Sequence, residues 1–349
     1  MTQIRGTQAG SGRPAGGAEG AGGTVAELGE FGLIAAMSAR LPTGPDVLLG
    51  PGDDAAVISA PDSRVVATTD MLVEGRHFRR DWSPAYDVGR KAAAQNLADV
   101  AAMGAVPTAL LVSFGAPPDL PAQWALEFTE GLRDETAEAG ASVAGGDVVA
   151  SGPIVVSITA LGTLRGRPAV TRSGARPGDV VAVCGRLGWS AAGLTVLGRG
   201  FRSPRVVVEA HRRPEPPYDA GPEAAELGAS ALIDVSDGLL ADLGHVARAS
   251  GVRIDVDTGT LDVADPLRAV AAAINADPLR FVLTGGEDHA LAATFGPDVE
   301  LPERWRVVGR VLAAKEHGQT GGEPHAGAEP AVTVDGEEYE GPAGHDHFR

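Results

Sequence analysis

Apolar residues in the first half of the chain fall into two kinds of run. From Glu27 they recur at helical spacing until Pro42 and Gly44 interrupt the pattern. The same spacing predicts helices over residues 84–103 and 121–139. Shorter apolar runs predict strands over residues 55–59, 64–72, 108–114, 143–149 and 154–164. This mixture is typical of an α+β domain.

A second unit follows a polar, Gly- and Pro-rich stretch at residues 171–179, which indicates a domain junction. Beyond it the pattern predicts strands over residues 180–184, 253–256, 281–283, 290–295, 305–311 and 331–334. It predicts helices over residues 189–197, 204–211, 223–227 and 238–249. Residues 1–24 are mostly small or polar, so we expect a disordered tail, and residues 316–330 have the composition of a linker. The expected domains are residues 25–168 and 169–349.

Composition limits the kinds of partner that the protein can have. The 349 residues sum to a net charge of −17 at pH 7, which disfavours a general nucleic-acid or anionic-membrane surface. The one cysteine, Cys184, cannot form an internal disulfide and fits a reducing cytoplasm. The amino-terminal stretch has no signal-peptide pattern, and no apolar run approaches about 18 residues. We therefore expect a cytoplasmic protein that does not span a membrane.

Lysine is nearly absent, because the sequence contains only Lys91 and Lys315 and otherwise uses arginine. Neither the P-loop pattern Gly-x-x-x-x-Gly-Lys-Ser/Thr nor the protein-kinase set of motifs occurs. The Gly-rich stretch after residues 180–184 has the spacing Gly-x-x-Gly, which excludes a dinucleotide-binding fold. The common ways of binding ATP are therefore excluded, and any anion must be bound locally.

Aspartates recur at expected strand ends and helix starts, each beside Gly, Ser, Thr or Asn rather than a basic residue. They are Asp53, Asp54, Asp70, Asp99, Asp147, Asp234 and Asp237. Any one of them is explained by ordinary turn chemistry. Together, so many carboxylates would repel one another unless cations bridged them. Oxygen ligands of this kind favour hard divalent cations, above all Mg²⁺.

Several of these segments leave a structural and a functional interpretation open. Asn96 and Asp99 share one face of an apolar helix, which either meets solvent or, as we favour, is buried against something charged. Ser236 or Asp237 can cap the helix that follows, and the same helix start can hold a phosphate. The Thr-Gly-Gly-Glu-Asp loop and the histidine of Glu-Gly-Arg-His-Phe are equally explained as ordinary loop and surface features.

Nine sequence blocks, taken in order, resemble the signature of the thiamine-monophosphate kinase family. They are GEFGLI, GPGDDAAV, TTDMLVEGRHF, RKAAAQNLADVAAMGA, AGGDVV, TRSGARPGD, IDVSDGLLADLGH, LTGGEDHAL and GHDHF. The resemblance runs from about Gly29 to the carboxyl end. GEF, VEGRHF and GGED separate this family from its relatives in the superfamily that includes aminoimidazole ribonucleotide synthetase.

The resemblance implies ATP-dependent phosphorylation of thiamine monophosphate to thiamine diphosphate. It implies two α+β domains, an N-terminal sheet with helices that binds ATP and several Mg²⁺ ions and forms a homodimer, and a C-terminal α/β sandwich with a substrate-contacting tail. Because the acceptor phosphate is already ionised at neutral pH, we expect direct in-line transfer with no general base and no protein nucleophile.

The residues that match the family pattern fall into three groups. The metal ligands are Asp54, Thr68, Thr69, Asp70, Asp99, Asp147, Asp234 and Asp237. The ATP-binding residues are Gly146, Asp147, Arg172 and Ser236. His77 and Glu287 match substrate contacts, and His345 or Phe348 replaces an aromatic residue that the family often has near the carboxyl end.

Two alternatives are kept beside this assignment. Another ATP-using enzyme of the superfamily, such as a selenophosphate synthetase, would need a reactive Cys or selenocysteine and a nearby Lys early in the chain, and neither is present. A non-enzymatic cation-binding protein would explain the aspartates but not the Arg172 and Ser236 beside them. Nucleotide binding that depends on Mg²⁺ would distinguish a kinase from such a protein.

Overall fold

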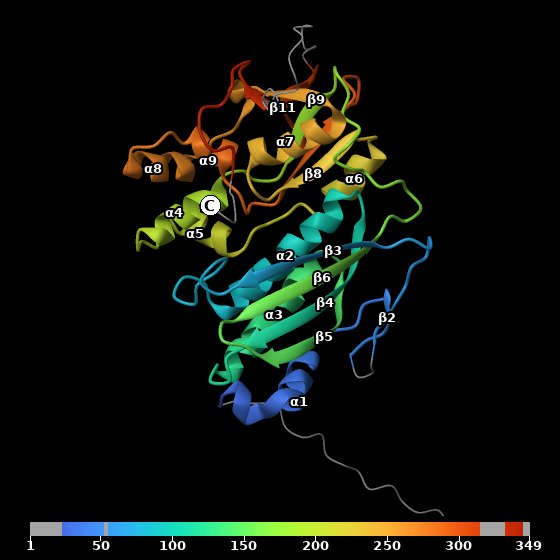
Figure 1. Cartoon of the computed structure of the whole chain (residues 1–349), viewed down its shortest axis with the longest axis vertical. Helices are drawn as coiled ribbons and strands as arrows, with labels where there is room; N and C mark the ends of the chain where they lie inside the picture. The colour runs from blue at the N-terminus through green and yellow to red at the C-terminus, as the bar shows by residue number, and fades with distance from the viewer. Residues whose placement is uncertain (1–22, 52–54, 315–331, 345–349) are drawn as a thin grey trace, which may run out of the picture.

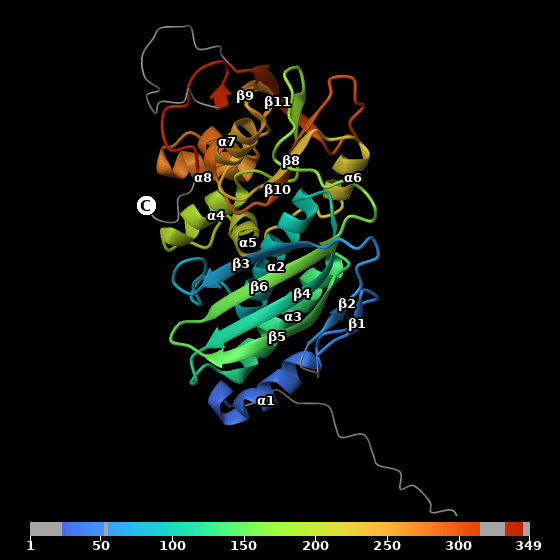
Figure 2. The ribbon, with the colours of Figure 1, turned by 45° about the vertical axis from the view of Figure 1, so that its right-hand side comes forward.

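The computed structural model describes residues 23–51, 55–314 and 332–344. The predictions for residues 1–22, Asp53, Asp54, the linker at 316–330, His345 and Phe348 lie outside the described residues. Two sheets, each built from a separate half of the chain, lie one above the other along the long axis of the molecule (Figures 1 and 2).

Four strands of the first half form a sheet in the order β3-β6-β4-β5. β6 pairs antiparallel with β3 and β4, and β4 pairs parallel with β5. The strands are β3 (Val66–Val73), β4 (Val106–Ala116), β5 (Ser142–Ala150) and β6 (Val155–Thr163). Helices α2 (Ala85–Ala102) and α3 (Ala122–Glu138) cover one face, and no helix of the described part of the chain covers the other (Figures 1 and 2).

Three short elements complete this half. Helix α1 (Val25–Ser38) packs against α3 and begins with a capping box, in which Thr24 accepts from the Glu27 amide and the Glu27 carboxylate accepts from the Thr24 amide. Strands β1 (Val47–Leu49) and β2 (Val57–Ile58) pair antiparallel. Their side chains Val47 and Ile58 pack on part of the open sheet face.

Helices α2 and α3 approach each other closely because two glycines face the neighbouring backbone. A Cβ atom on Gly89 would lie 2.0 Å from the Phe128 carbonyl oxygen, and one on Gly131 would lie 2.0 Å from that of Tyr86. Any larger residue would force the helices apart. Since the sheet lies on its other side, α2 is buried along most of its length, and its polar side chains need partners inside the protein.

Six strands of the second half form a mixed sheet in the order β12-β9-β11-β7-β10-β8. All neighbours are antiparallel except β9 and β12. The strands are β7 (Val180–Cys184), β8 (Ala231–Val235), β9 (Val252–Val256), β10 (Ala290–Phe295), β11 (Arg306–Ala313) and β12 (Val332–Val334).

Helices cover both faces of this sheet, as expected of an α/β sandwich. The leucines of α7 pack on one face, while α6 and the last turn of α2 pack on the other. The helical elements are α4 (Trp189–Gly198), α5 (Arg205–Arg212), α6 (Ala220–Glu226), α7 (Leu239–Ser250), the 3₁₀ turn η1 (Thr258–Thr260), α8 (Asp265–Ile274) and α9 (Leu279–Thr284). No helix in the described ranges is long and apolar enough to cross a membrane.

Two local predictions for the second half differ from the structure. Residues 281–283, expected as a strand, lie in helix α9, which begins after Pro278 with the Leu279 amide donating to the Asp277 carboxylate. Leu279 and Leu283 face one apolar cluster and Val282 another, an arrangement that a short apolar run cannot reveal by itself. Strand β8 was not among the predicted strands, although all five of its residues are buried.

Candidate active site

Of the polar pair on α2, Asn96 is buried against strand β3 and Asp99 is partly buried beside it, so this face of the helix does not simply meet solvent. Asn96 is 1% exposed, and its Oδ1 accepts from the Asp70 amide at 3.0 Å. Its Nδ2 donates to the Ala92 carbonyl at 2.9 Å. One turn further on, Asp99 accepts a hydrogen bond from the Thr68 hydroxyl at 2.8 Å. The side chains of α2 thus hold the segment of β3 that carries Thr68 and Asp70.

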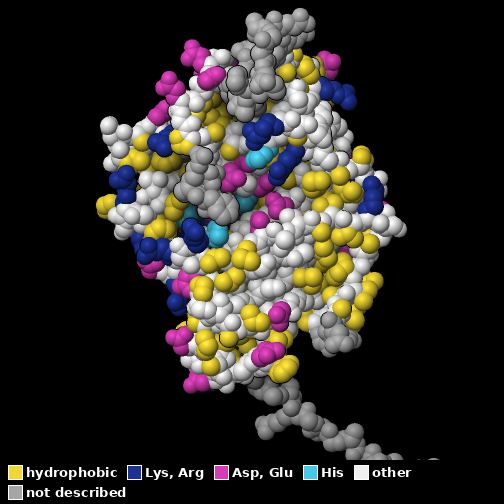
Figure 3. Space-filling view, viewed as in Figure 1, with side chains coloured by type: hydrophobic (Ala, Val, Ile, Leu, Met, Phe, Trp, Pro, Cys, Tyr) yellow, Lys and Arg dark blue, Asp and Glu magenta, His cyan; other side chains and the backbone are white. Residues whose placement is uncertain are grey.

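The second half of the chain brings a further carboxylate to this place. Asp234, on β8, is buried, and its Oδ2 lies 3.0 Å from Nδ1 of His289. Asp234, Asp99, Thr68 and Arg172 line a cavity of about 210 Å³ whose remaining walls are mostly apolar. Figure 3 shows acidic side chains gathered in the hollow between the two halves, with histidine and basic side chains beside them.

Electrostatic repulsion is strong at this junction. Burial raises the pKa of Asp99, and the charges of Asp234 and Asp70 raise it further, to about 7. Burial lowers the pKa of His289, but the hydrogen bond and charge of Asp234 outweigh it, so the pKa lies above its usual value. We call Asp70, Asp99 and Asp234 the acidic cluster.

The acidic cluster has the chemistry of a hard-cation site. Its donors are carboxylate oxygens with a threonine hydroxyl beside them, and a divalent cation would relieve their repulsion. Within the described residues, no three His, Cys, Asp or Glu side chains are arranged to hold a metal by themselves. A cation bound here would therefore need additional ligands.

The turn after β8 places Ser236 and Asp237 next to the acidic cluster. The expectation that one of them caps the following helix is wrong, because Gly238 is the N-cap residue of α7. The Asp242 carboxylate reaches back instead and accepts from the amides of Asp237 and Gly238, each at 3.0 Å. Gly238 makes this possible with φ 129°, where a side chain would also meet the Thr284 backbone.

Three of the expected ligands lie apart from the acidic cluster. The Thr69 side chain is on the opposite face of β3 from Thr68, and its hydroxyl donates to the Ile158 carbonyl at 3.0 Å. Gly146 and Asp147 lie on β5, at the other edge of the sheet from β3. Three strand spacings separate these edges, about 14 Å. Within one chain, Asp147 therefore lies too far from Asp70 to share a cation with it.

The two expected substrate contacts approach each other at the opposite end of α2. Nδ1 of His77 accepts from the Val73 amide at 3.0 Å. Lys91 lies between the two segments, with Nζ 3.1 Å from Oε1 of Glu287 and 3.5 Å from the His77 carbonyl oxygen. On the other side of Glu287, Nδ1 of His211 lies 3.4 Å from Oε2.

Sequence reasoning assigned no role to Lys91, His211, His289 or Asp242. Lys91 and His289 lie inside two of the sequence blocks that resemble the family, and Lys91 is one of only two lysines. A role for either residue could therefore have been suspected from the sequence. His211 stands in none of the blocks, and its place beside Glu287 depends entirely on the packing of α5.

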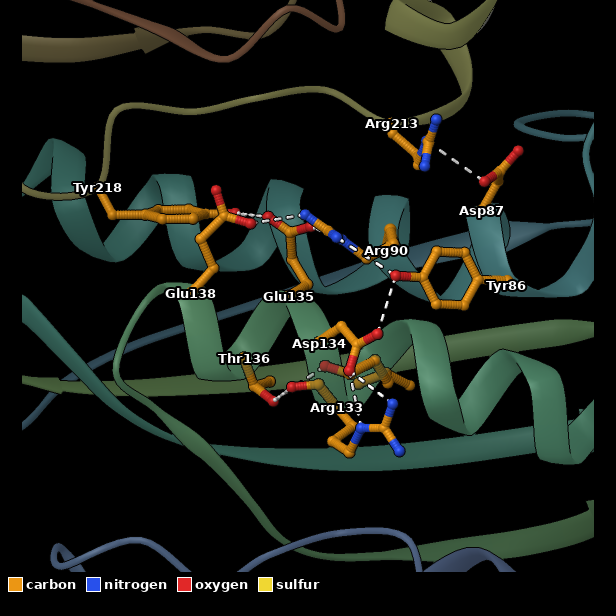
Figure 4. Close-up of polar contacts among 11 residues, drawn as sticks. Tyr86, Asp87, Arg90, Arg133, Asp134, Glu135, Thr136, Glu138, Arg213 and Tyr218 are labelled. Carbon is orange, nitrogen blue, oxygen red and sulfur yellow. Dashed lines mark hydrogen bonds and ion pairs between the residues drawn. The ribbon is translucent and has the colours of Figure 1, made fainter.

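Further ion pairs surround the amino-terminal end of α2 (Figure 4). Arg90 pairs with Glu135 of α3, and the Tyr218 hydroxyl donates to the same carboxylate at 2.5 Å. Arg213 lies 3.4 Å from Asp87. Tyr218 and Arg213 belong to the segment between α5 and α6, so these contacts attach the second half of the chain to α2 and α3.

Comparisons with known proteins agree with this architecture. Residues 52–164 match the family model "AIR synthase related protein, N-terminal domain". A thiamine-monophosphate kinase from Mycobacterium tuberculosis is 49% identical over 93% of each chain. The crystal structure of a thiamine-monophosphate kinase from Stenotrophomonas maltophilia superposes with a TM-score of 0.74 at 31% identity, covering 88% of this chain and 96% of that one. A structure named AaThiL complexed with AMPPCP and TMP superposes with a TM-score of 0.72 at 32% identity, covering 91% and 96%.

The fold and the junction site thus define an α+β protein of the AIR synthase-related class, which confirms the expected architecture. The degree of identity, over nearly the whole length of the relatives, narrows the assignment further. The chain belongs to the thiamine-monophosphate kinase family.

Proposed function

We propose that this protein transfers the γ-phosphoryl group of ATP to thiamine monophosphate, giving thiamine diphosphate and ADP. The observation that carries this conclusion is the acidic cluster at the junction of the two halves, in a chain that belongs to this family. The structural relative complexed with AMPPCP and TMP supports the choice of both substrates.

The residues of the chain divide between the two ends of α2. Thr68, Asp70, Asp99, Asp234 and Asp237 form the Mg²⁺-binding part, with Asp54 as a further ligand. Bound Mg²⁺ would neutralise charge on the phosphates as transfer proceeds. Arg172, which lines the cavity, and Ser236, at the turn into α7, hold ATP. Glu287, His77 and the carboxyl-terminal His345 or Phe348 contact the thiamine part of the substrate.

Transfer is direct, without a phosphoenzyme. The carboxylates of the acidic cluster face one another as ligands, and Nδ1 of His77 is occupied by the Val73 amide. The acceptor oxygen is already anionic, so no base has to remove a proton.

The active form is a homodimer joined through the open face of the first sheet. This face carries Met71 and Val149, which are 53% and 54% exposed, beside Leu111. Exposed apolar side chains gathered on one sheet face are typical of an interface. Thr69 and Asp147 point to the same face, so a partner sheet packed there would bring them toward a second acidic cluster. In this arrangement residues 25–168 form the ATP-binding and dimerisation domain, and residues 169–349 form the domain that closes the site.

The test is a direct assay of the purified protein with ATP, Mg²⁺ and thiamine monophosphate. We expect thiamine diphosphate and ADP to form in equal amounts, and no thiamine diphosphate without Mg²⁺. ATP made chiral at the γ-phosphorus should give product of inverted configuration, whereas net retention or a trapped phosphoenzyme would contradict direct transfer. Metal binding without nucleotide binding would contradict the kinase assignment itself.

A further inference from the structure

Lys91 is a buried charge with an unusual environment. Its side chain is 3% exposed, on the part of α2 enclosed by α3, α5 and the loop before β10. A buried ammonium group is costly unless it is paired, and losing the partner of a buried ion pair is strongly destabilising. Apart from Lys315, the other basic side chains of this type along the chain are arginines. A compact, strongly charged group is therefore used at this one buried position.

Lys91 neutralises Glu287 and holds it in place. Glu287 has φ 64°, in the left-handed region that costs energy for a residue with a side chain. Its amide donates to the Ser236 carbonyl at 2.7 Å, which ties the loop to the turn after β8. Oε1 of the carboxylate faces Lys91 at 3.1 Å, and Oε2 lies 3.4 Å from Nδ1 of His211, which is itself hydrogen-bonded to the Ser190 hydroxyl at 3.0 Å. The carboxylate is thus fixed in direction while remaining partly open to the outside, with a side-chain exposure of 35%.

The charges around Glu287 fit this arrangement. Burial alone would raise the pKa of Glu287, but the charge and hydrogen bond of Lys91, together with His211 and His289, outweigh it and lower the pKa to about 2. Burial and the same ammonium group lower the pKa of His211 to about 3, so this histidine is neutral. Glu287 is therefore an anion with one cationic partner.

We propose that Lys91 is a positioning residue for the substrate: it fixes the Glu287 carboxylate so that this group can receive the thiamine part of thiamine monophosphate. The inference rests on the proposed function. Thiamine carries a positively charged thiazolium ring, and with Glu287 neutralising Lys91 the ammonium group does not repel a cation that approaches the carboxylate. Lys91 acts through Glu287. Its ammonium group also contacts the His77 carbonyl at 3.5 Å, which keeps the segment that carries His77, the second expected substrate contact, close to Glu287.

The position of Lys91 along α2 separates this role from ATP binding. Lys91 and Asp99 of the acidic cluster are eight positions apart, or about 12 Å along the helix. Removing the ammonium group should therefore weaken the productive binding of thiamine monophosphate and leave the nucleotide site intact.

The experiment measures the KM for thiamine monophosphate and for ATP, and the dissociation constant of AMPPCP, in the full-length protein. The variants are Lys91→Met, Glu287→Gln and the double variant, with Arg205→Met as the control because it removes one positive charge from the exposed face of α5. We expect Lys91→Met to raise the KM for thiamine monophosphate at least tenfold and to change the AMPPCP dissociation constant less than twofold. The control should match the wild type.

The double variant keeps the inference testable even if Lys91→Met alone does not fold. Removing both charges avoids an unpaired buried ion, so the double variant should melt at a higher temperature than Glu287→Gln. Since Lys91 acts through Glu287, its KM for thiamine monophosphate should lie within twofold of that of Glu287→Gln.

Three results would overturn the inference while the proposed function stands. They are a KM for thiamine monophosphate unchanged by Lys91→Met, an equal loss of affinity for both substrates, and effects of the two substitutions that multiply. A wild-type protein that does not phosphorylate thiamine monophosphate would overturn the proposed function, and this inference with it.

Discussion

The two ends of helix α2 both lie inside the protein, but the acidic side chains near them have opposite kinds of neighbour. At the amino-terminal end three acids each have a cation beside them: Arg213 for Asp87, Arg90 for Glu135 and Lys91 for Glu287. At the carboxyl-terminal end Asp99 meets two more carboxylates, and the basic side chains beside them are His289, bound to Asp234, and Arg172 on the cavity wall.

This difference separates two uses of a buried carboxylate. Paired acids join elements that are far apart in the sequence, and they need no ligand. The charges of Asp234 and Asp70 raise the pKa of Asp99, and acids that face one another in this way are stabilised when positive charge is added. Acids paired with cations should matter for stability and positioning, and acids that face one another should matter for phosphate chemistry.

The largest effect is expected from Asp99→Asn, which removes one charge from the acidic cluster. Activity should fall by about 10²-fold or more, as for the loss of one group that stabilises charge in a transition state. The melting temperature without Mg²⁺ should stay the same or rise, because a repulsive charge has gone. Steady-state kinetics and calorimetry check both parts, and turnover within twofold of the wild type would contradict the role of Asp99.

A second prediction concerns Asp147, which lies apart from the acidic cluster of its own chain. Asp147→Asn should inactivate the enzyme while leaving its melting temperature unchanged, because the side chain is exposed and makes no hydrogen bond or ion pair within the described part of the chain. If the partner subunit supplies Asp147, mixing this variant with Asp99→Asn after subunit exchange should restore about a quarter of wild-type activity. A mixture as inactive as its components would place both residues in one chain's site or show that the sheets do not pair.

Substitutions near the amino-terminal end of α2, where the acids are paired with cations, should lower the stability of the protein rather than its rate of catalysis. Glu135→Ala leaves Arg90 and the Tyr218 hydroxyl without their shared acceptor, so the free energy of unfolding should fall by about 3 kcal/mol. Glu138→Ala is the matched control, because Glu138 pairs with the same arginine at the surface and should cost less than about 1 kcal/mol. Urea unfolding measures both. A loss of activity in folded Glu135→Ala would contradict the division between the two ends.

The smallest effect is expected on the unfolding of the protein at low pH. Because Lys91, together with His211 and His289, lowers the pKa of Glu287 from 4.5 to about 2, the charge interactions of Glu287 contribute stability above about pH 4.5, and this is lost as the pH falls toward 2. Lys91→Met should remove the Lys91 part of that contribution and shift acid unfolding to higher pH by less than about one unit. An acid transition identical to that of the wild type would show that the pair contributes nothing to stability.

Much of the fold could be predicted from periodicity alone. The helical spacing of α2 and α3 and the apolar runs of β4, β6 and β7 indicated their elements to within about two residues. The short run at 281–283 was assigned wrongly, because three or four apolar residues suit a strand or a buried helix equally. Its conformation follows from the two apolar clusters that it joins.

The sequence by itself determined the chemistry: aspartates beside small polar residues, no P-loop, and blocks that resemble one family. Only the tertiary structure decided which carboxylates meet. It placed Asp99 and Asp234 at one cavity, turned Thr69 and Asp147 to the open face, and paired Lys91 with Glu287. The physical reason is that residue type and local spacing fix what a side chain can do. Its partners, and with them its charge state, are set by the packing of segments that lie far apart along the chain.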